Sequence, residues 1–400
     1  MTDARPLDLL VTLWPSFPHF AQFADDPRLA GIRLNSAMVS NAEIEQELGI
    51  AAAHRGSVPL FFDVKGRQLR IVEVDAQPDH LECVLNHPIA VQTPTSVLFK
   101  GGEDSARLDR LADGGRRLIF HRGPRFAVRP GESLHIRHPS LRVSGNLFTE
   151  QELQKIATVR GAGFTRYFLS YVESARDVDE FRELVGRDAE VWLKIENPKG
   201  LQYVATEFRK EPNLVLVAAC GDLYVEMERP HAILGALRMI VEHDPEACVG
   251  SRMLLSVVQE PLPPMLRSAL QYIAERRPET SDLHRMLMAV LHRPVPSLAD
   301  FAQLAWLYDI GYRRMMLCDE LCLKGELLTT AVHAFDAFRT SYGAPITKAS
   351  PLISKGHSAA GSTSAPAATT TPPRPTVSAP IKGPRILWTP LRSPPRGGPK

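Results

Sequence analysis

The segment AEVWLKIENPKGLQYVATEFRKEPNLVLVAACGDLYVE, residues 189–226, contains two apolar runs that are each followed at once by charged residues. The runs at 189–195 and 213–219 are apolar on nearly consecutive positions, which is typical of strands buried on both faces in a parallel sheet. Residues i and i+2 of a strand share a face, so Lys194 and Glu196 should project together. Asp222 follows the second run. The segment therefore predicts two buried strands with charges at their carboxyl ends.

The rest of the chain repeats this alternation of buried strand and helix. Helical periodicity is evident at 149–160, 175–185, 228–243 and 299–308. Six further apolar runs lie at 7–13, 31–34, 58–64, 167–172, 247–255 and 312–318. Eight strands alternating with helices predict a closed (β/α)8 barrel of the TIM type, whose sites lie at the carboxyl ends of the strands.

Two insertions and a tail depart from the alternation. Residues 72–146, after the third strand, contain short β-like runs broken by Gly and Pro, which predicts a small β-rich, lid-like side domain. Residues 257–295 predict two helices inserted after the seventh strand, and residues 1–71 and 147–343 then form the barrel. Residues 344–400 are rich in Pro, Ser and Thr and contain no acidic residue, which predicts a disordered basic tail.

Composition excludes several classes of function. With 47 basic and 45 acidic residues the chain has almost no net charge, so no overall field favours a nucleic-acid partner. Apolar runs are too short to span a membrane or serve as a secretory signal. Five cysteines, mostly in apolar runs, predict buried free thiols in a reducing cytoplasm. The thirteen histidines show no pairing at metal-ligand spacing, so we assign them no role and expect most at the surface or in loops.

Charged or polar side chains end four of the predicted strands. Unpaired charge near a barrel interior is costly, so these groups should pair with one another, bind a metal or bind a charged ligand. Two carboxylates with a lysine beside them and an arginine opposite suit Mg²⁺ or Mn²⁺ with open positions for an oxyanion. A ring of structural ion pairs is the alternative. The groups are Arg33, Asn35, Asp63, Lys65, Lys194, Glu196 and Asp222.

Several short motifs resemble those of the pyruvate kinase family. KIENPKG (194–200) followed by VLVAACGDLYVE (215–226) resembles the family's KIEN-x-x-G and MVARGDLGVE. Further similar stretches, in the family's order, are VTLWPS (11–16, TIGPS), IRLNSAM (32–38, ARLNFSH), DVKGRQLR (63–70, DTKGPEIR), FLSYVESARDVDEF (168–181, ASFVR-x-x-x-DV) and GSRMLLS (250–256, ATQMLES). The β-rich insertion falls where the family carries its lid, although it is shorter, and residues 344–400 do not resemble the family's C-terminal regulatory domain.

The resemblance implies an enzyme that transfers phosphate from phosphoenolpyruvate to ADP, giving pyruvate and ATP. It implies that Glu196 and Asp222 hold Mg²⁺ or Mn²⁺ and that Lys194 neutralises the phosphoryl group in flight. Ser251 stands where the family has a threonine that helps to place the proton on the enolate. Arg33 and Arg70 would contact phosphate, and Arg33 would thereby share in catalysis.

Departures from the family's motifs lie on the nucleotide and potassium side. Ala37 and Met38 replace a serine and a histidine, which leaves Asn35 and Asp63 as candidate ligands of a monovalent cation and puts potassium binding in question. Cys220 replaces an arginine. The lid lysine that reaches the nucleotide has no clear counterpart, the nearest candidates being Arg137 and Arg142.

Three functions therefore remain open on the sequence. The first is a pyruvate kinase. The second is a lyase that handles pyruvate or phosphoenolpyruvate on the same metal–enolate core, which altered nucleotide-side residues would suit. The third is a catalytically degenerate paralogue that binds a ligand or partner, against which the intact metal carboxylates count. The sequence also leaves open whether the chain forms a homo-oligomer.

Overall fold

Eight parallel strands close into a barrel in the computed structural model, which describes residues 6–54, 56–77, 79–258, 264–291 and 296–342. Each strand pairs with the next around the ring, and β1 pairs with β2 to close it. Every strand overlaps one of the eight predicted apolar runs, so the (β/α)8 prediction is confirmed. In barrel order the strands are β1 (Asp8–Thr12), β15 (Arg314–Met316), β14 (Cys248–Gly250), β13 (Leu214–Ala219), β12 (Glu190–Ile195), β11 (Arg166–Leu169), β3 (Leu60–Val64) and β2 (Gly31–Asn35).

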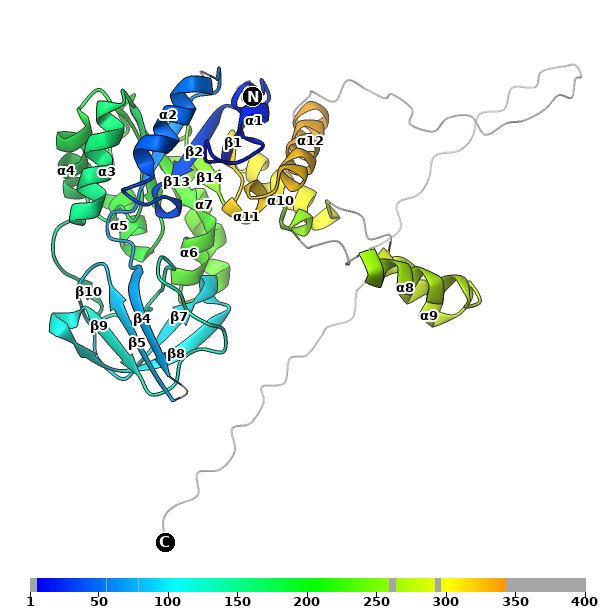
Figure 1. Ribbon diagram of the computed structural model, residues 1–400. Helices are drawn as coiled ribbons and strands as arrows, with labels where there is room; N and C mark the ends of the chain where they lie inside the picture. Colours follow the sequence, from blue (N-terminus) through cyan, green and yellow to red (C-terminus); the bar gives the residue numbers. More distant parts are fainter. Residues whose placement is uncertain (1–5, 55, 78, 259–263, 292–295, 343–400) are drawn as a thin grey trace, which may run out of the picture. The chain divides into compact units, whose positions relative to one another are not determined.

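Helices between the strands surround the barrel (Figure 1). Local sequence fixes several of their starts: Ser174 and Ser297 form capping boxes, and Asn197 accepts a hydrogen bond from the Gly200 amide. The helices are α1 (Phe20–Ala24), α2 (Ile44–His54), α3 (Glu150–Gly161), α4 (Ala175–Val185), α5 (Pro198–Thr206), α6 (Cys220–Glu226), α7 (Ile233–His243), α10 (Leu298–Asp309), α11 (Asp319–Cys322) and α12 (Gly325–Tyr342).

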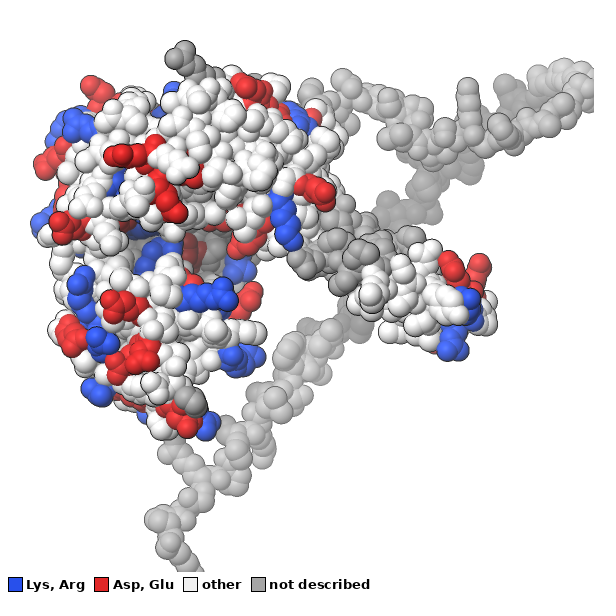
Figure 2. Space-filling model, viewed as in Figure 1, with Lys and Arg blue, Asp and Glu red and all other residues white. Residues whose placement is uncertain are grey.

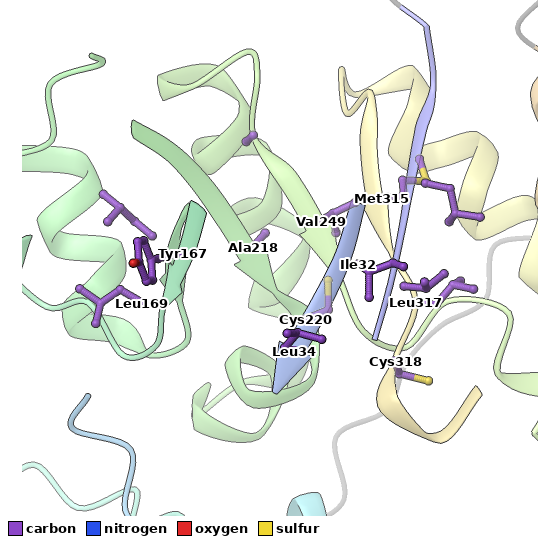
Figure 3. Packing of buried hydrophobic residues seen from close by; sticks show 14 of the residues in the cluster. Ile32, Leu34, Tyr167, Leu169, Ala218, Cys220, Val249, Met315, Leu317 and Cys318 are labelled. Atoms are coloured by element: carbon purple, nitrogen blue, oxygen red, sulfur yellow. The ribbon is translucent and has the colours of Figure 1, made fainter. Parts of the chain in front are cut away.

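The barrel strands carry apolar side chains on both faces. Alternate residues such as Tyr167 and Leu169 point outward and pack under the helices (Figure 3). Phe168, between them, points inward and packs with Phe61 and Trp192, the ring centroids lying 5.4 Å and 5.2 Å from that of Phe168. This double burial explains why the strands are apolar on consecutive residues.

A separate β domain is inserted between β3 and α3, as the sequence predicts. Its five-stranded antiparallel sheet has its own apolar core, and a two-stranded sheet of β6 (Ile89–Ala90) and β10 (Arg142–Val143) accompanies it. The five strands, in sheet order, are β4 (Ile71–Gln77), β5 (His80–Leu85), β9 (Arg117–Phe120), β8 (Asp104–Ala112) and β7 (Thr95–Phe99).

The second insertion contains α8 (Pro264–Glu275) and α9 (Asp282–Leu291), which pack against each other. The predicted disordered tail at 344–400 lies outside the described residues. No described helix combines the length and apolar character needed to cross a membrane. All five cysteines are buried free thiols. On the face seen in Figure 2, charges of both signs are intermixed.

Replacing Phe168 tests the inner core. Phe168→Ala should lower the free energy of unfolding by about 3–5 kcal/mol, because a fully buried ring is lost and a cavity is left between Phe61 and Trp192. Urea denaturation followed by tryptophan fluorescence measures the change. Phe126→Ala is the matched control, since that ring is 54% exposed, and an equal loss in both variants would contradict the packing described.

Candidate active site

A buried carboxylate, Asp63 at the end of β3, lies among three cations. Its side chain has 0% exposed surface, and its Oδ2 lies 2.7 Å from Lys65 Nζ, 3.2 Å from Arg33 Nη1 and 3.7 Å from Lys194 Nζ. Ser170, at the end of β11, donates to Oδ1 at 3.2 Å. Burial alone would raise the pKa of Asp63, but the charges of Lys194, Lys65 and Arg33 outweigh it and hold the pKa well below its usual range.

Arg33 and Asn35, which share a face of β2, are both tied to Asp319. Arg33 Nε donates to Thr12 Oγ1 at 2.9 Å, and its Nη2 donates to the Asp319 carboxylate. Asn35 Nδ2 donates to the other Asp319 oxygen at 2.7 Å, while the Asn35 side-chain oxygen accepts from the Ala37 amide. Asp319 begins α11 directly after the eighth strand, and sequence reasoning missed it.

Lys194 and Glu196, two residues apart at the end of β12, form an ion pair with Nζ and Oε1 2.8 Å apart. Lys194 also donates to Ser170 Oγ at 2.9 Å, and Glu196 Oε2 accepts from the Tyr171 amide at 2.7 Å. Glu196 has 0% exposed surface, and Lys194 is the cation that contacts its Oε1. Burial raises the pKa of Glu196 to about 7; Lys194 opposes this rise and the charge of Asp222 adds to it.

Asp222 and Glu226 lie one turn apart on α6, and His135 of the β domain packs against both. His135 Nδ1 lies 2.7 Å from Glu226 Oε1, and Nε2 lies 3.6 Å from Asp222 Oδ1. The Tyr171 hydroxyl donates to Glu226 Oε1 at 3.3 Å. Burial would lower the pKa of His135, but the Glu226 hydrogen bond and the two carboxylate charges raise it. We expected most histidines at the surface or in loops, and His135 is an exception, since it is 1% exposed and contacts Asp222.

One cavity of about 410 Å³ at the carboxyl ends of the strands gathers most of the predicted site. Asp63 and Glu196 are fully buried and do not line it. Ser251 N donates to Met316 O at 3.1 Å, which fixes the serine at the end of β14. Of the sequence-predicted residues, those lining the cavity are Arg33, Asn35, Lys65, Arg70, Lys194, Asp222 and Ser251.

Arg70 has no carboxylate partner among the described residues. Its Nε and Nη2 donate to Gln68 Oε1 at 3.0 Å and 2.7 Å, and its Nη1 donates to Gly131 O at 2.6 Å. Because these acceptors are neutral, the charge of Arg70 is left for a ligand in the cavity. An anionic ligand in this cavity could contact both Arg33 and Arg70.

Arg137 and Arg142, the candidates for the lid cation, do not line this cavity. Arg142 is exposed and donates to backbone carbonyls of its own segment, and Arg137 donates to Val225 O. Arg137 instead lines a second cavity of about 510 Å³ between the β domain and the barrel, together with Arg67 and Lys199. Tyr171 and Glu226 also line this second cavity.

The carboxylates at this site suit a hard divalent cation that a bound substrate also coordinates. Within the described residues no three His, Cys, Asp or Glu side chains are grouped closely enough to hold a metal ion unaided. Mg²⁺, however, is commonly bound by one or two carboxylates that leave positions for water and substrate oxygens. Glu196, a buried carboxylate paired with the single cation Lys194, and Asp222 at the cavity wall fit that pattern.

Comparison with known proteins gives one distant relative. The chain is 25% identical over 276 residues to the pyruvate kinase of Methanocaldococcus jannaschii, a match that covers 65% of this chain and 60% of that enzyme. The chain thus spans about 60% of the length of the curated relative it matches. No protein-family model matches the sequence.

Asp63→Asn should lower the free energy of unfolding at pH 7 by about 3–5 kcal/mol, because Arg33, Lys65 and Lys194 would lose their shared counter-charge. A depressed folded pKa stabilises the protein above the unfolded pKa of about 4, and this contribution is lost as pH falls below it. The difference between wild type and variant should therefore shrink from pH 7 to pH 3 in urea denaturation series.

Asp282→Asn provides the control for this prediction. Its partner Arg285 is exposed, and surface ion pairs contribute about 0–1 kcal/mol, so little change is expected at any pH. A pH-independent difference between wild type and Asp63→Asn would contradict the electrostatic explanation.

Proposed function

Because the chain is pyruvate kinase-like in its sequence and in its barrel with an inserted β domain, we propose that it transfers the phosphoryl group of phosphoenolpyruvate to ADP, giving pyruvate and ATP. The observation that carries the proposal is the buried pair Lys194 and Glu196 beside Asp222, at a cavity that Arg33 and Arg70 also line. Phosphoryl transfer requires mainly positioning and charge neutralisation, and this arrangement of charges can provide both.

Each side chain has a distinct task in this proposal. Arg33 and Arg70 bind the phosphate oxygens, and the contacts of Arg33 with Asp63, Asp319 and Thr12 hold its guanidinium in place. Lys194 stabilises the charge on the phosphoryl group during transfer. The Ser251 hydroxyl orients the proton that the enolate receives. A divalent metal bound by Glu196 and Asp222 would supply further positive charge beside the phosphate and carboxylate of the substrate.

The β domain would exclude water from the transfer. His135 and Arg137 contact α6 of the barrel through Glu226 and the Val225 carbonyl. These contacts connect the β domain to the barrel next to Asp222. Closure of the β domain over the site would protect the phosphoryl group from hydrolysis and strengthen the electrostatic interactions within the site.

The second cavity favours a kinase over the lyase alternative. It combines cationic side chains of Arg67, Arg137 and Lys199 with an apolar wall that includes Leu134 and Ile136, and three glutamates also line it. Cations suit the phosphates of a nucleotide and an apolar wall suits its base. A lyase acting on pyruvate alone has no need of a second site of this kind. As a kinase the protein would serve glycolysis, in the cytoplasm that its cysteines predict.

Lys194→Met should abolish pyruvate formation from phosphoenolpyruvate and ADP. We expect a wild-type activity that requires Mg²⁺ or Mn²⁺ and a loss of about a thousandfold or more in the variant, because the charge beside the transferred group is removed. A lactate dehydrogenase-coupled assay measures it. Lys210→Met is the matched control, since Lys210 lines neither cavity and pairs with Asp244 and Glu246. Wild-type protein that forms no pyruvate would overturn the kinase proposal.

Potassium should not be required for activity. Lys65 Nζ lies 2.7 Å from Asp63, and both Asn35 side-chain groups are already hydrogen bonded, so an ammonium stands where a monovalent cation would meet these residues. We therefore expect equal activity in KCl and in tetramethylammonium chloride of the same ionic strength. A tenfold stimulation by K⁺ would show that Asn35 and Asp63 still bind the cation.

A further inference from the structure

Arg252, which follows β14, is a cation of the active-site cavity that the proposed function does not yet use. It lines the cavity of about 410 Å³ and is partly buried. Four carboxylates also line the cavity, but none of the described residues forms an ion pair with Arg252. Its guanidinium lies 5.2 Å from the ring centroid of Tyr224 on α6. Because a neutral ring does not cancel the charge, Arg252 can still bind an anion.

The backbone after β14 directs two consecutive side chains to this cavity. Residues along an extended strand point alternately to opposite faces, yet Ser251 and Arg252 both line the cavity. Both adopt left-handed backbone conformations, with φ of +70° and +57°. This conformation is unfavourable for residues other than glycine, and such strain is concentrated at ligand-binding sites. The Ser251 amide holds the turn by donating to Met316 O at 3.1 Å.

Arg252 is also a feature of this chain rather than of the motifs that it resembles. Position 252 is glutamine in the family's ATQMLES, and position 220 is arginine in MVARGDLGVE, where this chain has Cys220. The two positions follow neighbouring strands, since Ala219 of β13 pairs with Gly250 of β14. Burial raises the pKa of the Cys220 thiol to about 12, and the nearby charge of Arg252 acts against this rise. A cation therefore reaches this part of the mouth from β14 instead of β13.

The strand order sets Arg252 against the other cation that has no carboxylate partner, Arg70. Arg70 follows β3 and Arg252 follows β14, and these two strands are four steps apart in the ring of eight. The two guanidinium groups thus enter the cavity from strands on opposite sides of the barrel. Lys194 ends β12, which is two steps from each of them. Two unpaired cations around one lysine suit a ligand with two separate anionic groups.

We propose that Arg252 binds the carboxylate of phosphoenolpyruvate, while Arg33 and Arg70 bind its phosphate. A guanidinium can donate two parallel hydrogen bonds to a carboxylate, which fixes the orientation of the bound group. Arg252 thereby selects a phosphate ester that also carries a carboxylate, and it directs the phosphoryl group away from β14. The inference rests on the proposed function in taking phosphoenolpyruvate as the ligand of this cavity.

Oxalate and inorganic phosphate test the two ends of the ligand separately, because the first has carboxylates and no phosphate. Isothermal titration calorimetry of the full-length protein with Mg²⁺ measures both affinities. We expect Arg252→Met to bind oxalate about tenfold or more weakly than wild type and to bind phosphate within about twofold of wild type. Arg70→Met should show the reverse pattern. Arg238→Met is the matched control for the lost charge, because Arg238 is exposed on α7 and lines neither cavity.

The outcomes separate this inference from the kinase proposal. Oxalate affinity that is equal in wild type and Arg252→Met overturns the inference, whether or not pyruvate is formed. Weaker binding of phosphate alone, or equal weakening of both probes with a lower urea midpoint, also overturns it, since Arg252 would then bind phosphate or be structural. Oxalate binding that depends on Arg252, in a wild-type protein that forms no pyruvate, supports the carboxylate site and overturns only the kinase proposal.

Discussion

The burial of two carboxylates, Asp63 and Glu196, constrains every other part of the site. Neither has any exposed surface, and an isolated ionised carboxylate at such a position is strongly unfavourable. Asp63 meets this constraint with three cations within 4 Å. Glu196 has a single close cation, Lys194, and the Tyr171 amide, so further positive charge nearby would stabilise its ionised form.

The contrast between these two carboxylates connects the fold to the proposed chemistry. Because Asp63 is saturated by side chains, it organises Arg33, Lys65 and Lys194 rather than binding an ion. Glu196 is not saturated by side chains in this way, and it and Asp222 are therefore the groups suited to a divalent metal. A barrel supplies this geometry directly, since the carboxyl ends of its parallel strands meet at one mouth.

Local sequence was sufficient to predict the barrel and most of this mouth. Strands buried on both faces are apolar at consecutive positions, and a charge at their end, such as Lys194 or Asp222, is then conspicuous. Spacing of two residues also predicted that Lys194 and Glu196 project together, and they form an ion pair. What it could not predict was pairing between distant elements. Asp319 contacts Arg33, which is 286 positions away in the sequence, and His135 of the β domain contacts Asp222 of the barrel. A single histidine in a β-rich insertion carries no local signal of such a contact.

Binding of oxalate, a planar dianion that resembles the enolate of pyruvate, tests most directly whether this mouth is a metal-dependent oxyanion site. Isothermal titration calorimetry would compare oxalate binding with Mg²⁺, with Mn²⁺ and with a chelator, in wild type and in Glu196→Gln. Binding that requires the divalent metal and disappears in the variant is the predicted result. Oxalate that binds equally well with the chelator, or equally well to Glu196→Gln, would contradict the role assigned to the buried carboxylates.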